Sequence, residues 1–89
     1  MSATALMDPR GLTSQQKRAF LTIADRRLYR RAGGWGRGDS GVTLAMVEAL
    51  TALGLVRIER GHTEPHPVLT GAGQMLLAVI QQRAERRRA

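Results

Sequence analysis

The sequence contains no cysteine, so neither disulfide bonds nor thiolate metal sites can stabilise the fold. Only three of its 89 residues are aromatic, Phe20, Tyr29 and Trp35, which disfavours a protein that stacks single-stranded bases on aromatic side chains. No apolar run is long enough to span a bilayer, and residues 1–10 lack the basic start and apolar centre of a signal peptide. We therefore expect one small cytoplasmic domain that does not contact a membrane.

Arginine is the residue that this chain has in excess. The net charge is +7, and of the fourteen basic residues only Lys17 is a lysine. A basic balance in a small domain favours a polyanionic partner, most often nucleic acid. The planar guanidinium group suits phosphate because it can donate two hydrogen bonds at once. Solubility alone is the other explanation of the charge, and the positions of the arginines favour nucleic acid over it.

The first half of the chain predicts a helix followed by a loop. We expect a flexible arm over 1–12, one domain over 13–86 and a basic tail over 87–89. Thr13 and Gln16 have the spacing of a capping box, and the helix that follows carries its apolar face at helical spacing and continues to about residue 31. That face consists of Ala19, Phe20, Ile23, Ala24 and Leu28.

The segment GGWGRGDSG over 33–41 predicts a loop, because glycine weakens helices and permits positive φ angles. We expect Trp35 to fold back from this loop onto the core. The spacing Gly36-x-Gly38-x-x-Gly41 also matches a dinucleotide-binding fingerprint. We discount that match because no strand is predicted before the glycines and too little chain follows to build a parallel sheet.

The second half predicts a helix over 43–53, a stop at Gly54, a short β-hairpin and a last helix. Residues 55–59 are β-prone, and Pro65 and Pro67 limit the returning strand to a short run around 68–69. Thr70 is placed to cap a helix that ends near Arg86. The predicted buried residues of the first of these helices are Val42, Met46, Ala49, Leu50 and Leu53, and those of the last helix are Ala72, Met75, Leu76, Val79 and Ile80.

Two pieces of this half, VEALTALGLVRIER and VLTGAGQMLL, carry a family resemblance. Their order of Leu-x-x-x-Gly-Leu-Val, a short polar turn and Leu-Thr-x-x-Gly resembles winged helix-turn-helix regulators of the MarR-like and PadR-like kind over residues 42–80. The resemblance implies an α+β, mainly helical fold with a two-stranded wing and a C-terminal helix, and a function in binding duplex DNA as a transcriptional regulator. The positions that carry it are Leu50, Gly54, Leu55, Val56, Leu69, Thr70 and Gly73.

The arginines suggest how such a protein would hold DNA. Those of the predicted wing can lie along phosphates, and the residues just before the helix over 43–53 stand where helix amides already favour an anion. Contacts of this kind position a protein on the duplex and make binding depend on salt, but they carry little sequence information. The predicted DNA-binding residues are Arg30, Arg31, Arg37, Ser40, Thr43, Arg57, Arg60 and His62.

The helix over 43–53 is poor in side chains that read base edges. Leu44 and Ala45 are apolar, Glu48 repels phosphate, and the short helix that normally precedes is either one turn around 38–41 or absent. This favours recognition through the backbone. It also keeps open a second hypothesis, a winged-helix module that docks on a larger regulator or on a polymerase subunit.

The sequence gives no positive sign of catalysis, a cofactor or a metal site. No serine or threonine has a supporting histidine and acid at suitable spacing, and His62, Glu64 and His66 are interpreted as solvated turn residues rather than metal ligands. The apolar width of the last helix suggests a homodimer, with simple completion of the core as the equal alternative.

Overall fold

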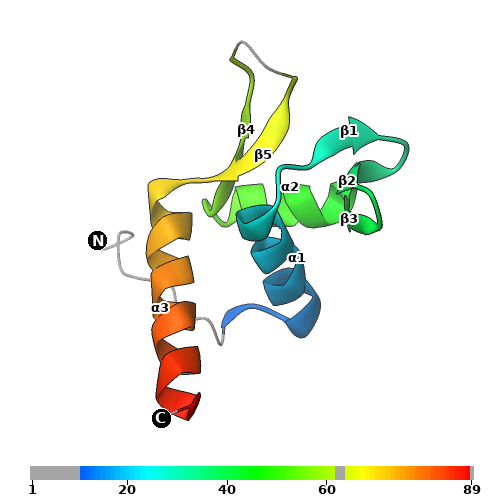
Figure 1. Cartoon of the computed structure of the whole chain (residues 1–89). Coiled ribbons are helices and arrows are strands. Elements are labelled where there is room, and N and C mark those ends of the chain that lie inside the picture. The colour runs from blue at the N-terminus through cyan, green and yellow to red at the C-terminus, as the bar shows by residue number, and fades with distance from the viewer. Residues whose placement is uncertain (1–10, 62–63, 89) are drawn as a thin grey trace.

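The computed structural model describes residues 11–61 and 64–88, and these form a small α+β fold (Figure 1). Three helices and two antiparallel sheets lie within the described ranges. Helix α1 spans Ser14–Asp25, α2 spans Leu44–Ala52 and α3 spans Gly71–Arg88. Strands β1 (Tyr29–Arg31), β2 (Gly34–Arg37) and β3 (Ser40–Thr43) make one sheet, and β4 (Val56–Glu59) and β5 (His66–Leu69) make the other.

Helix α1 begins as predicted and ends earlier than predicted. The Thr13 hydroxyl accepts from the Gln16 amide at 3.0 Å, and the Gln16 side chain accepts from the Thr13 amide at 3.0 Å, which confirms the capping box. The helix stops at Asp25, where Arg26 turns to extended backbone. The predicted continuation to residue 31 is therefore wrong, and Leu28, which is fully buried, enters the core from the connecting segment.

The glycine-rich segment is a sheet, so the prediction of a loop over 33–41 is wrong. Arg30, Trp35 and Val42 stand opposite one another across β1, β2 and β3 and therefore share one face. Trp35 and Val42 are each 7 % exposed, so this face packs on the core. The prediction that Trp35 folds onto the core is confirmed. Burial of these side chains and the strand pairing outweigh the poor intrinsic β-propensity of glycine.

Helix α2 and its stop follow the sequence signals. Thr43 caps the helix by accepting from the Met46 amide at 3.2 Å, and Gly54 ends it with φ +78°, the left-handed conformation that glycine adopts without strain. Val47 and Leu50 are buried. Leu53, which the sequence predicts to be buried, is 43 % exposed, because α1 and the two sheets cover only one side of this helix.

Strands β4 and β5 form the predicted hairpin, with Val56 opposite Leu69 and Glu59 opposite His66. The returning strand begins at His66, earlier than predicted, and Pro67 is buried within it. His66 is 5 % exposed, and its Nδ1 donates to the Glu64 carbonyl oxygen at 2.9 Å. The interpretation of His66 as a solvated residue is therefore wrong.

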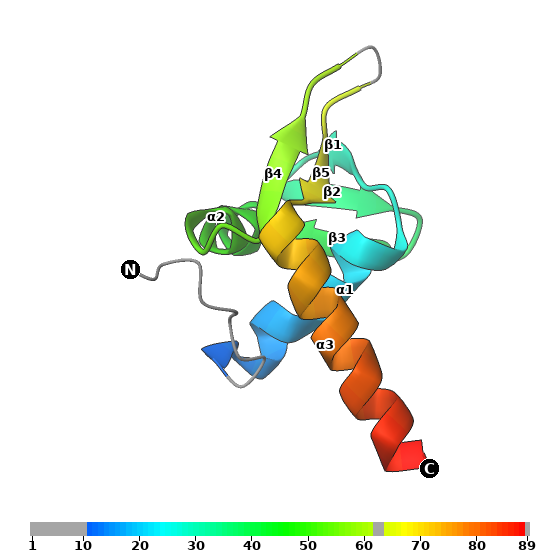
Figure 2. The ribbon, with the colours of Figure 1, turned by 90° about the vertical axis from the view of Figure 1, so that its left-hand side faces the viewer.

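Helix α3 packs against the core as far as Ile80, and its C-terminal part projects from the body of the molecule (Figures 1 and 2). The Thr70 hydroxyl donates to the Gly54 carbonyl and accepts from the Gly73 amide at 3.1 Å, which confirms the predicted cap. Leu76 is buried, whereas the predicted core residue Met75 is 53 % exposed. The apolar arc of this helix is wide, and the side that packs inward is centred on Gly73 rather than on Ala72.

The core is built by all three helices and both sheets, around the fully buried Phe20, Leu28 and Leu50. Leu12, assigned to the flexible arm, is only 8 % exposed and belongs to this core, while residues 1–10 of that arm lie outside the described residues. Three strands separate α1 from α2, so no short helix forms around 38–41. Within the described ranges, none of the helices has the length and apolar character required to cross a membrane.

Candidate nucleic-acid interface

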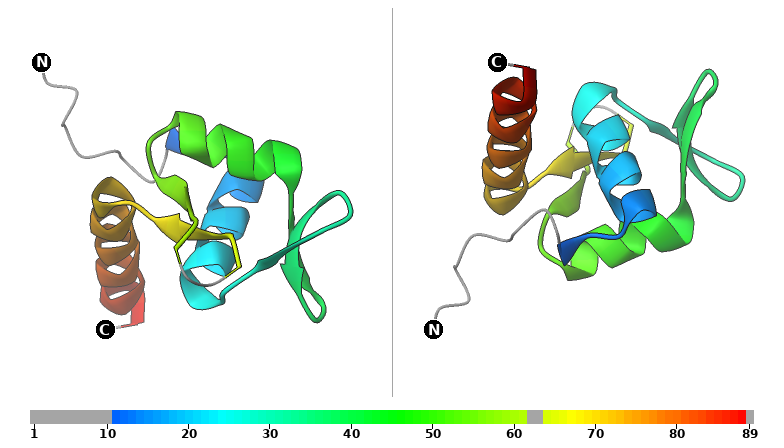
Figure 3. Two further views of the ribbon diagram at one scale, coloured as in Figure 1. Left: turned by 90° about the horizontal axis from the view of Figure 1, so that it is seen from above. Right: turned by 90° about the horizontal axis from the view of Figure 1, so that it is seen from below.

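Helix α2 lies between the two sheets with one side open to solvent. In Figure 1 the β4–β5 hairpin and the β1–β3 sheet rise on either side of it, and Figure 3 shows α1 crossing it from below. The buried residues of α2 are Val47 and Leu50, whereas Leu44, Ala45, Glu48 and Thr51 are exposed. Because Thr51 and Glu48 are the polar groups on that side, the prediction that α2 is poor in base-contacting side chains agrees with the structure.

An open groove of about 500 Å³ runs along this side of α2, and it brings two of the predicted arginines together. Arg30 enters it from β1 and Arg60 from the end of β4. Trp35, Leu44, Val47 and Ile58 supply much of the apolar wall. The two arginines are far apart in the chain, so their convergence depends on the placement of the hairpin beside the first sheet.

Arg30 is held in position at this groove. Its Nη1 donates to the Gly34 carbonyl at 2.8 Å and to the Arg31 carbonyl, and its guanidinium carbon lies 5.7 Å from the centre of the Trp35 ring. That distance is in the range of a cation–π contact. The Trp35 indole nitrogen itself is buried and has no hydrogen-bond partner among the described residues. The Arg30 side chain is therefore held in place at the groove, so that binding of an anion would cost it little further conformational entropy.

Arg60 differs from Arg30 because its side chain has no hydrogen bond or ion pair with any residue in 11–61 or 64–88. It is exposed at the mouth of the same groove. A guanidinium group that is exposed and unpartnered retains its donors for an incoming anion. Arg60 is thus available for a phosphate at this groove.

Arg31 lies on the opposite face of the first sheet. Its Nη1 donates to the Gly38 carbonyl and its Nη2 to the Ser40 carbonyl, each at 3.1 Å. The guanidinium rests on Gly36, where an added Cβ would come within 2.2 Å of it. Arg31 therefore straps β1 to β3 across the sheet, and part of its donor capacity is used within the fold.

Arg57 points away from the groove, because it alternates with Val56 and Ile58 along β4. It forms an exposed ion pair with Glu59 on the same strand. The hydrogen bond from Arg57, and then its charge, hold the pKa of Glu59 below its ordinary value. The charge of Arg57 is consequently balanced by that of Glu59 at neutral pH.

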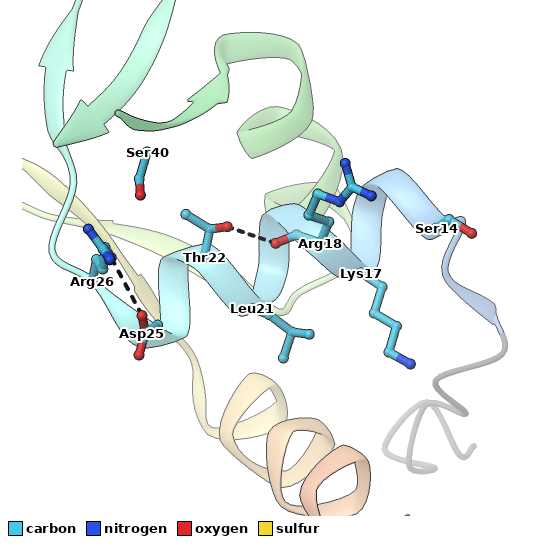
Figure 4. Close-up of a pocket in the computed structure, with 8 residues that line it drawn as sticks. All are labelled: Ser14, Lys17, Arg18, Leu21, Thr22, Asp25, Arg26 and Ser40. Atoms are coloured by element: carbon cyan, nitrogen blue, oxygen red, sulfur yellow. Dashed lines mark hydrogen bonds and ion pairs between the residues drawn. The ribbon is translucent and has the colours of Figure 1, made fainter. Parts of the chain in front are cut away.

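A second basic groove, of about 620 Å³, lies along the solvent side of α1 (Figure 4). Lys17 and Arg18 project from the helix, Arg26 follows its last turn, and Ser40 lines the groove from β3. Asp25 is the acidic side chain of this groove. The sequence showed these cations on the outer side of the first helix, but only the fold brings Ser40 beside them.

The remaining predicted residues have separate locations. Thr43 is committed to the cap of α2, which leaves its hydroxyl engaged with the Met46 amide. Arg37 is exposed at the turn between β2 and β3. His62 lies outside the described residues. The described residues of the predicted set thus fall into separate places: Arg30 and Arg60 line the groove beside α2, and Arg31 and Thr43 line a smaller hollow of about 240 Å³ beside the first sheet.

Comparisons of this chain with protein-family models, with curated proteins and with solved structures found no match.

Proposed function

We propose that this protein is a cytoplasmic winged-helix transcriptional regulator that binds double-stranded DNA mainly through backbone phosphates. The groove beside α2 carries the proposal, since it joins Arg30 and Arg60 at the open side of a helix flanked by a hairpin. In this proposal α2 faces the duplex and the β4–β5 hairpin is the wing. The β1–β3 sheet takes the place of the short helix that precedes the recognition helix in the MarR-like and PadR-like pattern.

The chemistry of the groove supports backbone contact over base reading. The exposed polar side chains of α2 are few, and Glu48 disfavours close approach of phosphate to the middle of the helix. Arg30 is prepositioned and Arg60 is free among the described residues, so both can donate to phosphate oxygens without breaking an ion pair. Each phosphate neutralised in this way steepens the dependence of log K on log salt by about 0.9.

The test is fluorescence anisotropy with a random-sequence duplex over a series of salt concentrations. Arg60→Ala should weaken binding to every sequence and reduce the salt slope by about one. Arg86→Ala, which removes an exposed charge on α3 outside the groove, is the matched control and should have a smaller effect. Failure of the wild-type protein to bind any duplex at low salt would overturn the proposal.

A protein-docking module is the second candidate, and the exposed apolar side chains of α2 favour it. Leu44 is 37 % exposed and Leu53 is 43 % exposed. This candidate predicts no duplex binding at low salt. It also predicts that Leu44→Glu abolishes binding to a purified protein partner without unfolding the domain.

Helix α3 offers a surface for the proposed homodimer. Met75 is 53 % exposed and Val79 is partly exposed, and at 100° per residue both lie away from Gly73, which packs inward. A dimer would present two grooves at a fixed spacing. Sedimentation velocity measures the mass directly, and Met75→Glu should convert a dimer to a monomer. A wild-type protein that sediments as a monomer over the whole concentration range would contradict this part of the proposal.

A further inference from the structure

The groove along α1 has a clear excess of positive charge. Lys17, Arg18 and Arg26 line it together with one carboxylate, that of Asp25. The Asp25 carboxylate lies 3.6 Å from the Arg26 guanidinium, and both side chains are more than half exposed, so this pair is weak. The side chains of Lys17 and Arg18 form no ion pair with any residue that the structure describes. Two cations of this groove are therefore uncompensated.

The cations of this groove are spread along the length of α1. Lys17 and Arg18 lie in the first half of the helix, and Arg26 is the residue that follows its last turn. Cations spread along a helix in this way can contact more than one phosphate of a duplex. Ser40 lines the groove from β3 and adds a neutral donor (Figure 4).

The α1 groove is separate from the groove beside α2. The two share no lining residue, and they are built on different helices. The groove beside α2 is lined by Arg30 and Arg60, and the α1 groove is lined by Lys17, Arg18 and Arg26. A single straight duplex that lies on α2 between the wing and the first sheet leaves the outer side of α1 uncovered.

We propose that the α1 groove is a second phosphate-binding surface for duplex DNA, so that one molecule of this protein holds two DNA segments together. This inference rests on the proposed function, because the groove beside α2 supplies the first of the two contacts. The second contact is independent of sequence, since it uses cations and a hydroxyl aimed at the backbone.

A capture assay tests this directly. One duplex is fixed to beads and saturated with protein, and a second, fluorescent duplex of random sequence is then added at low salt. The double variant Lys17→Ala/Arg18→Ala removes the second surface, and Arg27→Ala/Arg86→Ala removes the same charge elsewhere. We expect the first variant to lower capture by about tenfold or more while binding of the first duplex in anisotropy changes by less than about threefold. The control variant should capture almost as well as wild type.

The outcomes separate this inference from the function on which it rests. Capture by wild type that is lost in Lys17→Ala/Arg18→Ala supports two surfaces on one molecule. Undiminished capture by that variant overturns the inference, and sedimentation in the same buffer then shows whether a dimer bridges the duplexes instead. Binding of the first duplex without any capture of the second also overturns the inference and leaves the proposed function standing. Absence of binding to any duplex overturns both.

Discussion

Gly73 is the position at which one added methyl group should do the most damage. A Cβ there would lie 2.2 Å from the Leu55 carbonyl oxygen, whereas ordinary contacts begin at 3.4 Å. The obstacle is backbone, and it is fixed by the bond from the Thr70 amide to the same oxygen at 3.0 Å. Overpacking typically costs about 1–3 kcal/mol, and the better helix propensity of alanine returns about 0.5–1 kcal/mol. The upper end of the overpacking cost applies here, because the contact is very short and the obstacle is fixed backbone, so we expect Gly73→Ala to destabilise the fold by about 2 kcal/mol.

The assay is thermal unfolding followed by circular dichroism, with urea unfolding as an independent measure. For a domain of this size, a loss of that magnitude lowers Tm by about 8–16 °C. Gly71→Ala is the matched control, because a Cβ at Gly71 meets nothing within 4 Å and the residue lies in the same turn. Equal Tm values for the two variants would refute the close approach of α3 to the Leu55 carbonyl.

Three further predictions follow from the described contacts. Gly36→Ala should displace the Arg31 guanidinium and lower the free energy of unfolding by about 1–2 kcal/mol. In a protein that already carries Arg31→Ala, the same change should cost little more. Fully additive losses of unfolding free energy in the double variant would contradict this contact. Arg57→Ala should raise the pKa of Glu59 in a carboxyl NMR titration. Because the fold lowers the pKa of Glu59, the pair stabilises the folded protein at pH values above the ordinary pKa of a carboxyl group. This stabilisation is lost as the pH falls through the lowered pKa. An unchanged pKa in Arg57→Ala would refute the pairing. Thr70→Val should cost about 1–2 kcal/mol by urea unfolding, and a neutral result would show that the cap is unimportant.

The elements with strong local signals were predictable from the sequence. Thr13 and Gln16 form the capping box, Gly54 stops α2, and Thr70 caps α3, each within a few residues of chain. The hairpin after Gly54 was also predictable, because a β-prone run and a proline-limited return enclose a short turn. In each case the residues that specify the element are neighbours, so local chemistry was sufficient.

The first sheet was not predictable by the same means. Its strands have three or four residues and contain several glycines, so neither alternation nor β-propensity was visible. The available signal was weaker: Trp35 and Val42 are the large apolar residues of the segment, and they become neighbours only through pairing. The arc of α3 was ambiguous for a related reason, since its apolar residues cover too much of the helix to fix its rotation.

The candidate site shows the same division. The sequence identified Arg30 and Arg60 as basic residues of interest, and charge alone justified that. It could not show that they share a groove, that Arg57 is paired with Glu59, or that Arg31 is used within the sheet. Those outcomes depend on strand alternation and on contacts between distant segments.

The hydrogen bonds of Arg31 across the first sheet make three positions interdependent, namely 31, 36 and 41. Arg31 can lie flat only while residue 36 has no side chain, and an added Cβ at residue 41 would also come within 3.0 Å of the guanidinium. Its two bonds in turn hold the carbonyls of Gly38 and Ser40. In evolutionary terms, glycine at 36 and 41 should persist for as long as arginine is kept at 31. In sequences that have another residue at position 31, larger residues should be tolerated at positions 36 and 41. We therefore expect positions 31, 36 and 41 to change together rather than one at a time.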